Sequence, residues 1–99
     1  MPKISVIIPV YNSEKYISKT INSVINQTYE EIEIIVIDDC SSDGSLEIVK
    51  QLKQEFPMIQ VIVFEENLGV AYARNKGIDL AKGQFVAFID ADDIWKPDK

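Results

Sequence analysis

Acidic side chains gather at the ends of two apolar segments, where they could bind a cation or a polar ligand. Two follow residues 32–37 and three follow residues 84–89: Asp38, Asp39, Asp90, Asp92 and Asp93. The Asp90-x-Asp92 spacing suits Mg²⁺ or Mn²⁺, because these ions prefer oxygen ligands and commonly take one or two carboxylates plus phosphate oxygens. Acidic pairs are also common in loops, so the inference depends on their shared position at the ends of apolar runs.

Motifs that are absent from the sequence narrow the kind of ligand. Neither a glycine-rich dinucleotide fingerprint nor a GxxxxGK[ST] loop follows the first apolar run, so no backbone cradle for phosphates is predicted. The chain has no histidine, which excludes His-based triads and His-rich metal sites. A diphosphate would instead be held by a divalent cation, with Arg74 as a second positive charge. Taken alone, Arg74 would be interpreted as a surface residue.

Seven segments must position these side chains. Short runs rich in Ile and Val predict four strands buried on both faces of a parallel sheet, at residues 4–9, 32–37, 59–64 and 84–89. Apolar stripes with helical spacing predict two helices, at residues 13–28 and 44–56, and a third is predicted at residues 68–81, where Gly83 would end it. Asn12 or Ser13 could cap the first of these helices, and Asn67 the third.

The alternation of strands and helices predicts an α/β fold, a three-layer Rossmann-like parallel sheet in the strand order 3-2-1-4. The chain moves outward from the first strand and then returns to its other side. The switch point therefore lies between the first and fourth strands, and ligands bind at the carboxyl ends of strands there. We expect the segments after strands one, two and four to converge at that edge.

Length, charge and cysteine usage limit the class of protein. The 99 residues suffice for one small domain, and the net charge of −6 argues against a nucleic-acid partner, which would require a basic face. No apolar run is long enough to span a bilayer. The single cysteine, Cys40, forms no internal disulfide, which agrees with a reducing compartment, so a cytoplasmic location is expected.

The motifs, taken in order, resemble family 2 glycosyltransferases. The resemblance is carried by Val6-Ile7-Ile8-Pro9-Val10-Tyr11-Asn12, by Asp38-Asp39-Cys40-Ser41-Ser42-Asp43-Gly44-Ser45, by Asn67-Leu68-Gly69 running to Arg74-Asn75-Lys76-Gly77, and by Phe88-Ile89-Asp90-Ala91-Asp92-Asp93. It covers essentially the whole chain. It implies the GT-A fold and transfer of a sugar from a nucleotide-diphosphate donor, with inversion at the anomeric carbon. A UDP-sugar is the expected donor, and synthesis of a surface polysaccharide or glycan is the expected process.

The resemblance also implies roles for individual residues. A segment after the first strand would line the nucleoside, with the ring of Tyr11 against the base: Pro9, Val10, Tyr11 and Asn12. Asp39 would accept a hydrogen bond from an imide N–H of the base, and Asp90 would contact the ribose. Asp92 would bind a Mn²⁺ or Mg²⁺ ion that bridges the phosphates, and Arg74 would lie near the base or the diphosphate.

Members of the family run well beyond residue 99. Residues 1–99 are therefore expected to be the part that binds the nucleotide-diphosphate sugar, a GT-A fold truncated at its C-terminus. No catalytic residue is predicted in this part. The general base and the pocket for a glycan or lipid-linked acceptor would lie in the later part, and the longer protein could sit peripherally at a membrane.

Two other functions are compatible with a small acidic α/β domain. A signalling receiver module is likewise a small parallel α/β domain with carboxylates that hold Mg²⁺, but it has a fifth strand and a lysine after it, which this chain lacks. A non-catalytic module that binds nucleotide sugars is the second alternative.

The uncharged strand at residues 84–89 would form an exposed sheet edge, which predicts a homodimer. Residues 94–99 folding back over that strand would instead give a monomer.

Overall fold

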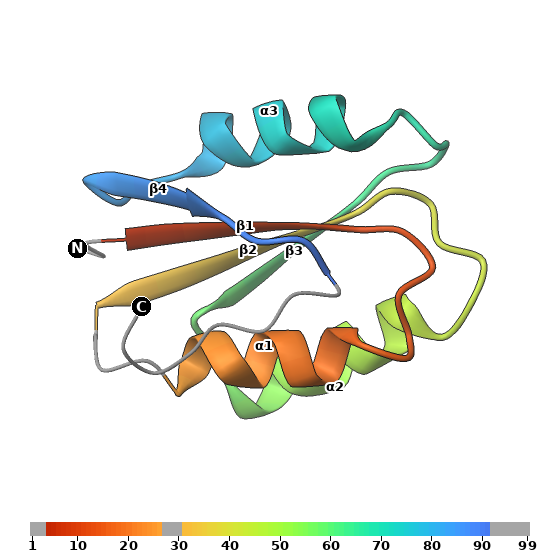
Figure 1. The fold of residues 1–99 in the computed structure, drawn as a ribbon, viewed down its shortest axis with the longest axis horizontal. Coiled ribbons are helices and arrows are strands. Elements are labelled where there is room, and N and C mark those ends of the chain that lie inside the picture. Colours follow the sequence, from red (N-terminus) through yellow and green to blue (C-terminus); the bar gives the residue numbers. More distant parts are fainter. Residues whose placement is uncertain (1–3, 27–30, 92–99) are drawn as a thin grey trace.

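The structure, a computed structural model, describes residues 4–26 and 31–91 and has an α/β architecture (Figure 1). The four strands are β1 (Ile4–Val10), β2 (Ile32–Asp38), β3 (Ile59–Val63) and β4 (Phe85–Phe88). The three helices are α1 (Ile17–Ile25), α2 (Ser45–Glu55) and α3 (Val70–Leu80). Strands and helices alternate along the chain as the hydrophobic pattern predicts.

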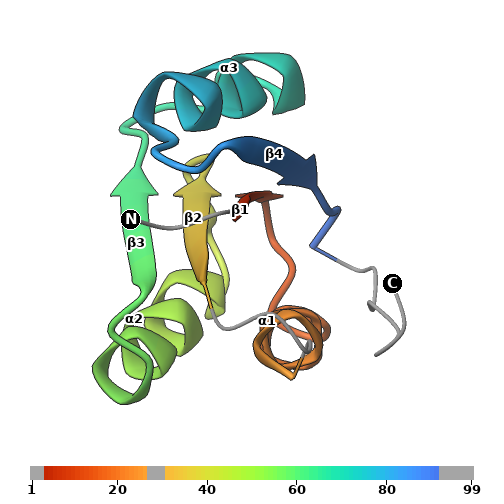
Figure 2. The ribbon, with the colours of Figure 1, turned by 90° about the vertical axis from the view of Figure 1, so that its left-hand side faces the viewer.

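The strands form one parallel sheet in the order β3-β2-β1-β4, which confirms the predicted topology. Seen end on, α3 covers one face of the sheet, while α1 and α2 cover the other (Figure 2). The chain leaves β1 toward β2 and β3 and returns to pair β4 with the other side of β1. The switch point therefore lies beside β1, where the parallel strands end at a common edge.

The two central strands supply most of the hydrophobic core. Alternate residues of β1 and β2 face opposite sides, so Val6 and Val36 pack toward α1 and α2, whereas Ile7 and Ile35 pack toward α3. The prediction that all four strands are buried on both faces is wrong for the outer two. Residues of β3 and β4 are largely half-buried or exposed, because each of these strands has only one sheet neighbour in the described chain.

α3 approaches the sheet closely at a single glycine. A Cβ atom placed on Gly77 would lie 2.5 Å from Cγ2 of Ile7, a buried residue of β1. No real Cβ contact is that short, so a side chain at this position would require α3 or Ile7 to move. Gly77 thereby sets the spacing between α3 and β1, and with it the height of the helix above the sheet.

The helices are shorter than predicted, and two predicted caps are wrong. α1 begins at Ile17, after a turn in which the carbonyl of Ser13 accepts the N–H groups of Tyr16 and Ile17, and no side chain caps it. α3 begins at Val70 after Gly69, and Asn67 lies too early in the chain to be its cap. The polar groups predicted as caps instead bind neighbouring loops, which brings those loops together at the edge of the sheet.

Candidate functional site

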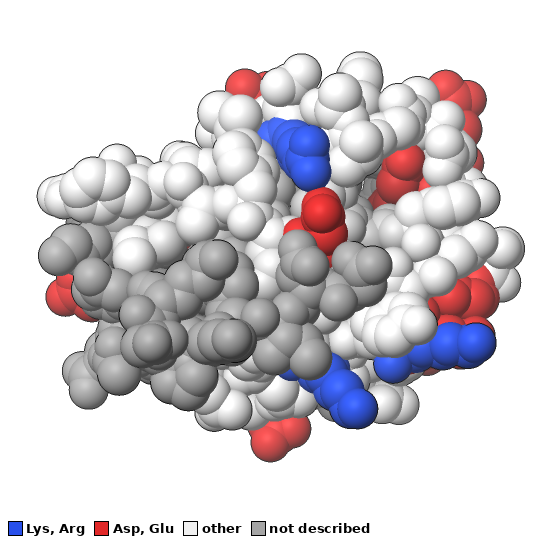
Figure 3. All heavy atoms as spheres, viewed as in Figure 1, with Lys and Arg blue, Asp and Glu red and all other residues white. Residues whose placement is uncertain are grey.

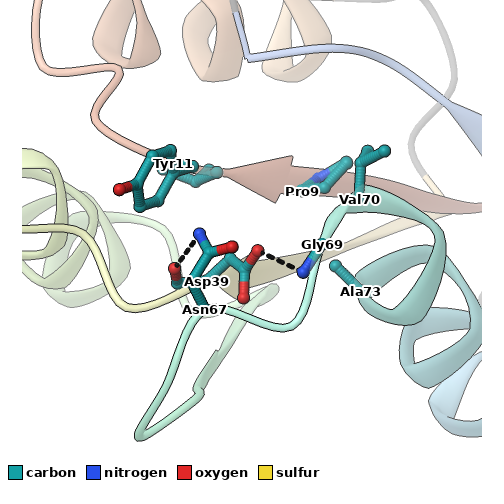
Figure 4. A pocket seen from close by; sticks show the side chains of 8 residues that line it. Pro9, Tyr11, Asp39, Asn67, Gly69, Val70 and Ala73 are labelled. Carbon is teal, nitrogen blue, oxygen red and sulfur yellow. Dashed lines mark hydrogen bonds between the residues drawn. The ribbon is translucent and has the colours of Figure 1, made fainter.

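A groove lies at the carboxyl ends of the strands, between β1, the loop after β2 and the start of α3. Its deeper part is a cavity of about 270 Å³ (Figure 4). This part is lined by Pro9, Val10, Tyr11, Asp39, Asn67, Gly69, Val70 and Ala73. A second cavity of about 350 Å³ shares Pro9, Tyr11 and Val70 and is completed by Asn12, Ser13, Tyr16, Asp90 and Ala91. The shared walls make the two cavities one continuous groove.

Asp39 is the polar centre of the deeper cavity and also holds its far wall. Its side chain is almost fully buried, and its two oxygens accept the backbone N–H groups of Leu68 at 2.7 Å and Gly69 at 2.9 Å. The amide of Asn67 donates to the backbone carbonyl of Asp39 at 3.2 Å, as Figure 4 shows. A carboxylate can accept about four hydrogen bonds, so Asp39 retains capacity for a donor group of a ligand.

The start of α3 depends on an unusual backbone conformation. Gly69 has φ of +95°, a region that residues with a Cβ rarely adopt. This conformation turns the N–H of Gly69 toward Asp39 and lets Val70 and Ala73 face the groove. The apolar side of the cavity therefore consists of Pro9, Val70 and Ala73, opposite the carboxylate (Figure 4).

Tyr11 is held in the groove by two loops that bind each other. The N–H of Asn12 donates to the hydroxyl of Ser41 at 3.0 Å, and the Asn12 side-chain oxygen accepts the N–H of Ser42 at 2.8 Å. Asn12 has φ of +50°, a conformation that asparagine tolerates better than most residues. Tyr11 is 52% exposed, so much of its ring remains accessible above the cavity. Asn12 thus lines the second cavity while its carboxamide oxygen supports the position of Tyr11.

Arg74 of α3 and Asp90, which follows β4, form an ion pair beside the second cavity; Asp90 lines that cavity, whereas Arg74 lines neither. An Arg74 Nη2 donates to Asp90 Oδ1 at 3.1 Å, with both side chains partly exposed. The guanidinium also lies 5.9 Å from the ring centroid of Phe88, within cation–π range. Its Nε is buried and has no acceptor among the described residues. Arg74 therefore keeps an unused donor that is shielded from solvent, while the rest of its guanidinium is partly exposed beside Asp90.

Two further aspartates, Asp38 at the end of β2 and Asp43 in the loop that follows, support this loop from within. Asp38 is buried and accepts the N–H of Ser41 at 3.1 Å, whereas its Oδ1 has no partner in the described chain. Asp43 accepts the N–H groups of Glu14 and Ser45. Burial alone would raise the pKa of Asp43, but the hydrogen bonds from Ser45 and Glu14 outweigh it and lower that pKa below its ordinary value. Neither carboxylate lines the groove.

The rim of the groove carries one described carboxylate, that of Asp90. Asp90 presents an exposed carboxylate at the rim, and Asp92, the predicted metal ligand, lies outside the described residues, as does Asp93. No three Asp, Glu, Cys or His side chains gather in residues 4–26 and 31–91. A cation bound with a diphosphate requires only one or two carboxylates, because phosphate oxygens complete its coordination. Among the described residues of the groove rim, Asp90 is the carboxylate that a hard cation could use.

Several residues of the groove were not predicted from the sequence. The sequence predicts Asn67 as a helix cap and places Val70 and Ala73 within the helix that follows, without a role in the site, yet all three line the deeper cavity. Their position at the start of the helix that follows β3 is the sequence feature from which their place in the groove could have been predicted.

Positive charge is scattered over the described part of the face in Figure 3, where Lys and Arg form no continuous basic surface. No helix in the described chain is long and apolar enough to cross a membrane.

The chain matches a family of known proteins. Residues 5–99 match the family described as Glycosyl transferase family 2. The chain is 47% identical over 98 residues to a Bacillus subtilis protein named "Putative teichuronic acid biosynthesis glycosyltransferase TuaG", covering 99% of this chain and 39% of that protein. These matches confirm the resemblance seen in the motifs and do not favour a receiver module.

Two solved structures have the same fold. S. aureus TarS 1–349 in complex with UDP-GlcNAc is 42% identical and superimposes with a TM-score of 0.85, covering 91% of this chain and 26% of TarS 1–349. The mannosyltransferase PcManGT from Pyrobaculum calidifontis, in complex with GDP-Man and Mn²⁺, is 30% identical with a TM-score of 0.88, covering 95% of this chain and 28% of that one. The present chain thus spans well under half of the relatives that it matches.

Proposed function

The chain belongs to glycosyl transferase family 2, and we propose that residues 1–99 are the part of an inverting glycosyltransferase that binds the nucleotide-diphosphate sugar, with a UDP-sugar as donor. The observation that carries the proposal is the groove in which Asp39 faces an apolar wall and Arg74 meets Asp90 farther along. One end suits a flat base with a donor N–H, and the other suits a ribose and phosphates. TarS, which binds UDP-GlcNAc, supports uracil as the base.

Each end of the groove has a chemical role in this proposal. Pro9 and Val70 pack against the base, Tyr11 covers it, and Asp39 accepts the imide N–H. Asp90 accepts a ribose hydroxyl, and the partly exposed guanidinium of Arg74 donates to the base or a phosphate oxygen. Asp39 is already fixed by two backbone N–H groups, so it needs little reorganisation when the nucleotide binds.

We further propose that Asp92 binds a divalent cation together with the diphosphate of the donor. The sequence places Asp92 two residues after Asp90, and PcManGT, which binds Mn²⁺ with GDP-Man, supports a metal-bound donor. When bound, such an ion neutralises the negative charge that develops on the departing nucleotide diphosphate. Asp90 and Arg74 would hold the nucleoside side of the same ligand.

The transfer itself requires groups beyond the groove. An acceptor hydroxyl attacks the anomeric carbon, its proton passes to a general base, and the bond between that carbon and the diphosphate oxygen breaks. We propose that this base, and the pocket for a glycan or lipid-linked acceptor, come from a longer protein, since the curated relatives are much longer than this chain. TuaG supports a role in cell-wall or surface polysaccharide synthesis. We propose a cytoplasmic location, with the longer protein peripheral at the membrane.

Calorimetry with UDP, GDP and dTDP, each with Mn²⁺ and with EDTA, tests this proposal. We expect UDP to bind best, and only when Mn²⁺ is present. Asp92→Asn should remove the dependence on metal, whereas Asp39→Ala should weaken UDP binding and keep that dependence. Asp79→Asn changes an exposed carboxylate of α3 outside the groove and should bind like the wild type. No binding of any nucleotide would refute the proposal, and equal binding with EDTA would refute the role of the metal.

A further inference from the structure

A buried hydroxyl on α1 binds the segment that carries Asp90. Thr20 is fully buried, and its Oγ1 donates to the backbone carbonyl of Ala91 at 2.6 Å, across 71 positions of the sequence. α1 lies under the sheet, on the side opposite α3 (Figures 1 and 2). The hydrogen bond therefore links the helix below the sheet to the strand end that forms the rim of the groove.

This hydrogen bond uses the only hydrogen that the hydroxyl has. In the interior of a helix, a threonine hydroxyl commonly donates to a carbonyl one turn earlier in the same helix. Thr20 donates to Ala91 instead, so its hydroxyl serves the tertiary structure. Because Ala91 is also buried, removing the hydroxyl would leave its carbonyl without that donor in a place that water reaches poorly.

The segment around Asp90 has little other support. β4 ends its register with β1 at Phe88, and the N–H of Ile89 makes one further backbone bond, to Ile7. Within the described chain, no backbone–backbone bond to the sheet follows at residues 90 or 91. Ile89 and Ala91 are buried among the apolar residues of the α1 side, whereas Asp90 between them is exposed and faces Arg74. The direction of the Asp90 carboxylate thus depends on its ion pair with Arg74 and on how its two buried neighbours are anchored.

We propose that Thr20 is a positioning residue of the nucleotide site, which holds Ala91 so that Asp90 stays at the rim of the groove. Thr20 itself does not line either cavity of the groove. This inference rests on the proposed function, because its effect is detected through nucleotide binding. Through the hydrogen bond from Thr20 to Ala91, α1 would help to position the nucleotide site, although α1 lies on the other side of the sheet from Arg74.

Substitution of the hydroxyl tests the proposal. Thr20→Val keeps the shape of the side chain and removes the hydroxyl, and Thr20→Ser keeps the hydroxyl. The dissociation constant for UDP with Mn²⁺ should rise about tenfold in Thr20→Val and stay within about twofold of the wild type in Thr20→Ser. Asn22→Ala is the matched control, because the Asn22 amide donates to the Ser18 carbonyl within α1 and not to the rim. It should bind UDP like the wild type.

A double-mutant cycle separates positioning from general destabilisation. If Thr20 acts through Asp90, Thr20→Val should cost little additional affinity once Asp90 is already Ala. Circular dichroism must first show that each variant is folded, and Thr20→Ala replaces Thr20→Val if that variant unfolds. Unchanged UDP binding in a folded hydroxyl-free variant, or an equal loss in the Asp90→Ala background, would overturn the proposal. Failure of the wild type to bind any nucleotide would instead refute the proposed function on which it rests.

Discussion

The carboxylate of Asp39 accepts the backbone N–H of Gly69 at 2.9 Å, at a residue whose φ is +95°. This contact joins the end of β2 to the start of α3 across 30 positions of the sequence. One side chain therefore shapes the wall of the groove and offers the acceptor expected for a base. Substitution of Asp39 should therefore lower both the stability of the fold and the affinity for a nucleotide, and each effect can be measured separately.

Asp39→Ala should lower both stability and nucleotide binding. It leaves the N–H groups of Leu68 and Gly69 without their acceptor, which should reduce the free energy of unfolding by roughly 1–3 kcal/mol. Urea unfolding measures this loss, and calorimetry with UDP measures binding. Asp79→Ala, at an exposed position of α3, should change neither quantity by much. An Asp39→Ala protein with wild-type stability would show that the two backbone contacts contribute nothing net.

Gly77→Ala should destabilise the fold by crowding. The added methyl would lie 2.5 Å from Ile7 Cγ2, and a buried β-branched side chain has little freedom to move away. Overpacking of this kind costs roughly 1–3 kcal/mol, which exceeds the gain of about 1 kcal/mol from replacing a helical glycine with alanine. Thermal unfolding measures the change. Asn75→Ala, at an exposed position of the same helix, is the control, and a Gly77→Ala protein as stable as that control would contradict the packing argument.

Stability should fall at acidic pH partly through Asp43. Its pKa is lower in the folded protein than the ordinary value of about 3.9 in an unfolded chain. The ionised form is therefore stabilising above about pH 3.9, and that contribution is lost as the pH falls through the lower folded pKa. Urea unfolding at pH 5 and pH 3 measures the loss, which should be smaller in Asp43→Asn. The same difference between the two pH values in both proteins would show that Asp43 has no part in it.

The edge of β4 that has no partner in the described sheet should make the chain self-associate, in keeping with the predicted homodimer. β4 pairs only with β1 in the described sheet, and Phe85, Val86 and Phe88 are 60%, 41% and 45% exposed. Unpaired backbone groups beside exposed apolar side chains favour pairing with a second copy. Light scattering should detect a dimer that Val86→Lys dissociates.

A matched control for this assembly lies on the opposite edge strand. Val63 is 47% exposed at the end of β3, so Val63→Lys adds the same charge to the other edge and should leave the dimer intact. A chain that stays monomeric at high concentration would contradict pairing through β4. The alternative in which residues 94–99 cover this strand concerns residues outside the described chain.

Local sequence patterns were sufficient to predict the architecture. Four short apolar runs separated by amphipathic stretches require parallel strands joined by helical crossovers, and their handedness leaves few strand orders. The same patterns predict that Pro9, Asp39 and Asp90 lie at strand ends that open onto one edge. These predictions succeeded because the position and type of each element follow from hydrophobicity over a few neighbouring residues, whereas the exposure of the outer strands β3 and β4 depends on their place in the sheet.

Only the tertiary structure determines which polar side chains form hydrogen bonds with residues distant in the sequence. Asn67 and Asn12 have the chemistry of helix caps, yet one amide binds Asp39 and the other side chain binds Ser42. In the sequence, Thr20 is an ordinary helical residue, and its hydroxyl meets Ala91 only after β4 has paired with β1. A polar side chain has several local partners of similar energy, so its choice depends on which groups the packed sheet and helices bring within about 3 Å.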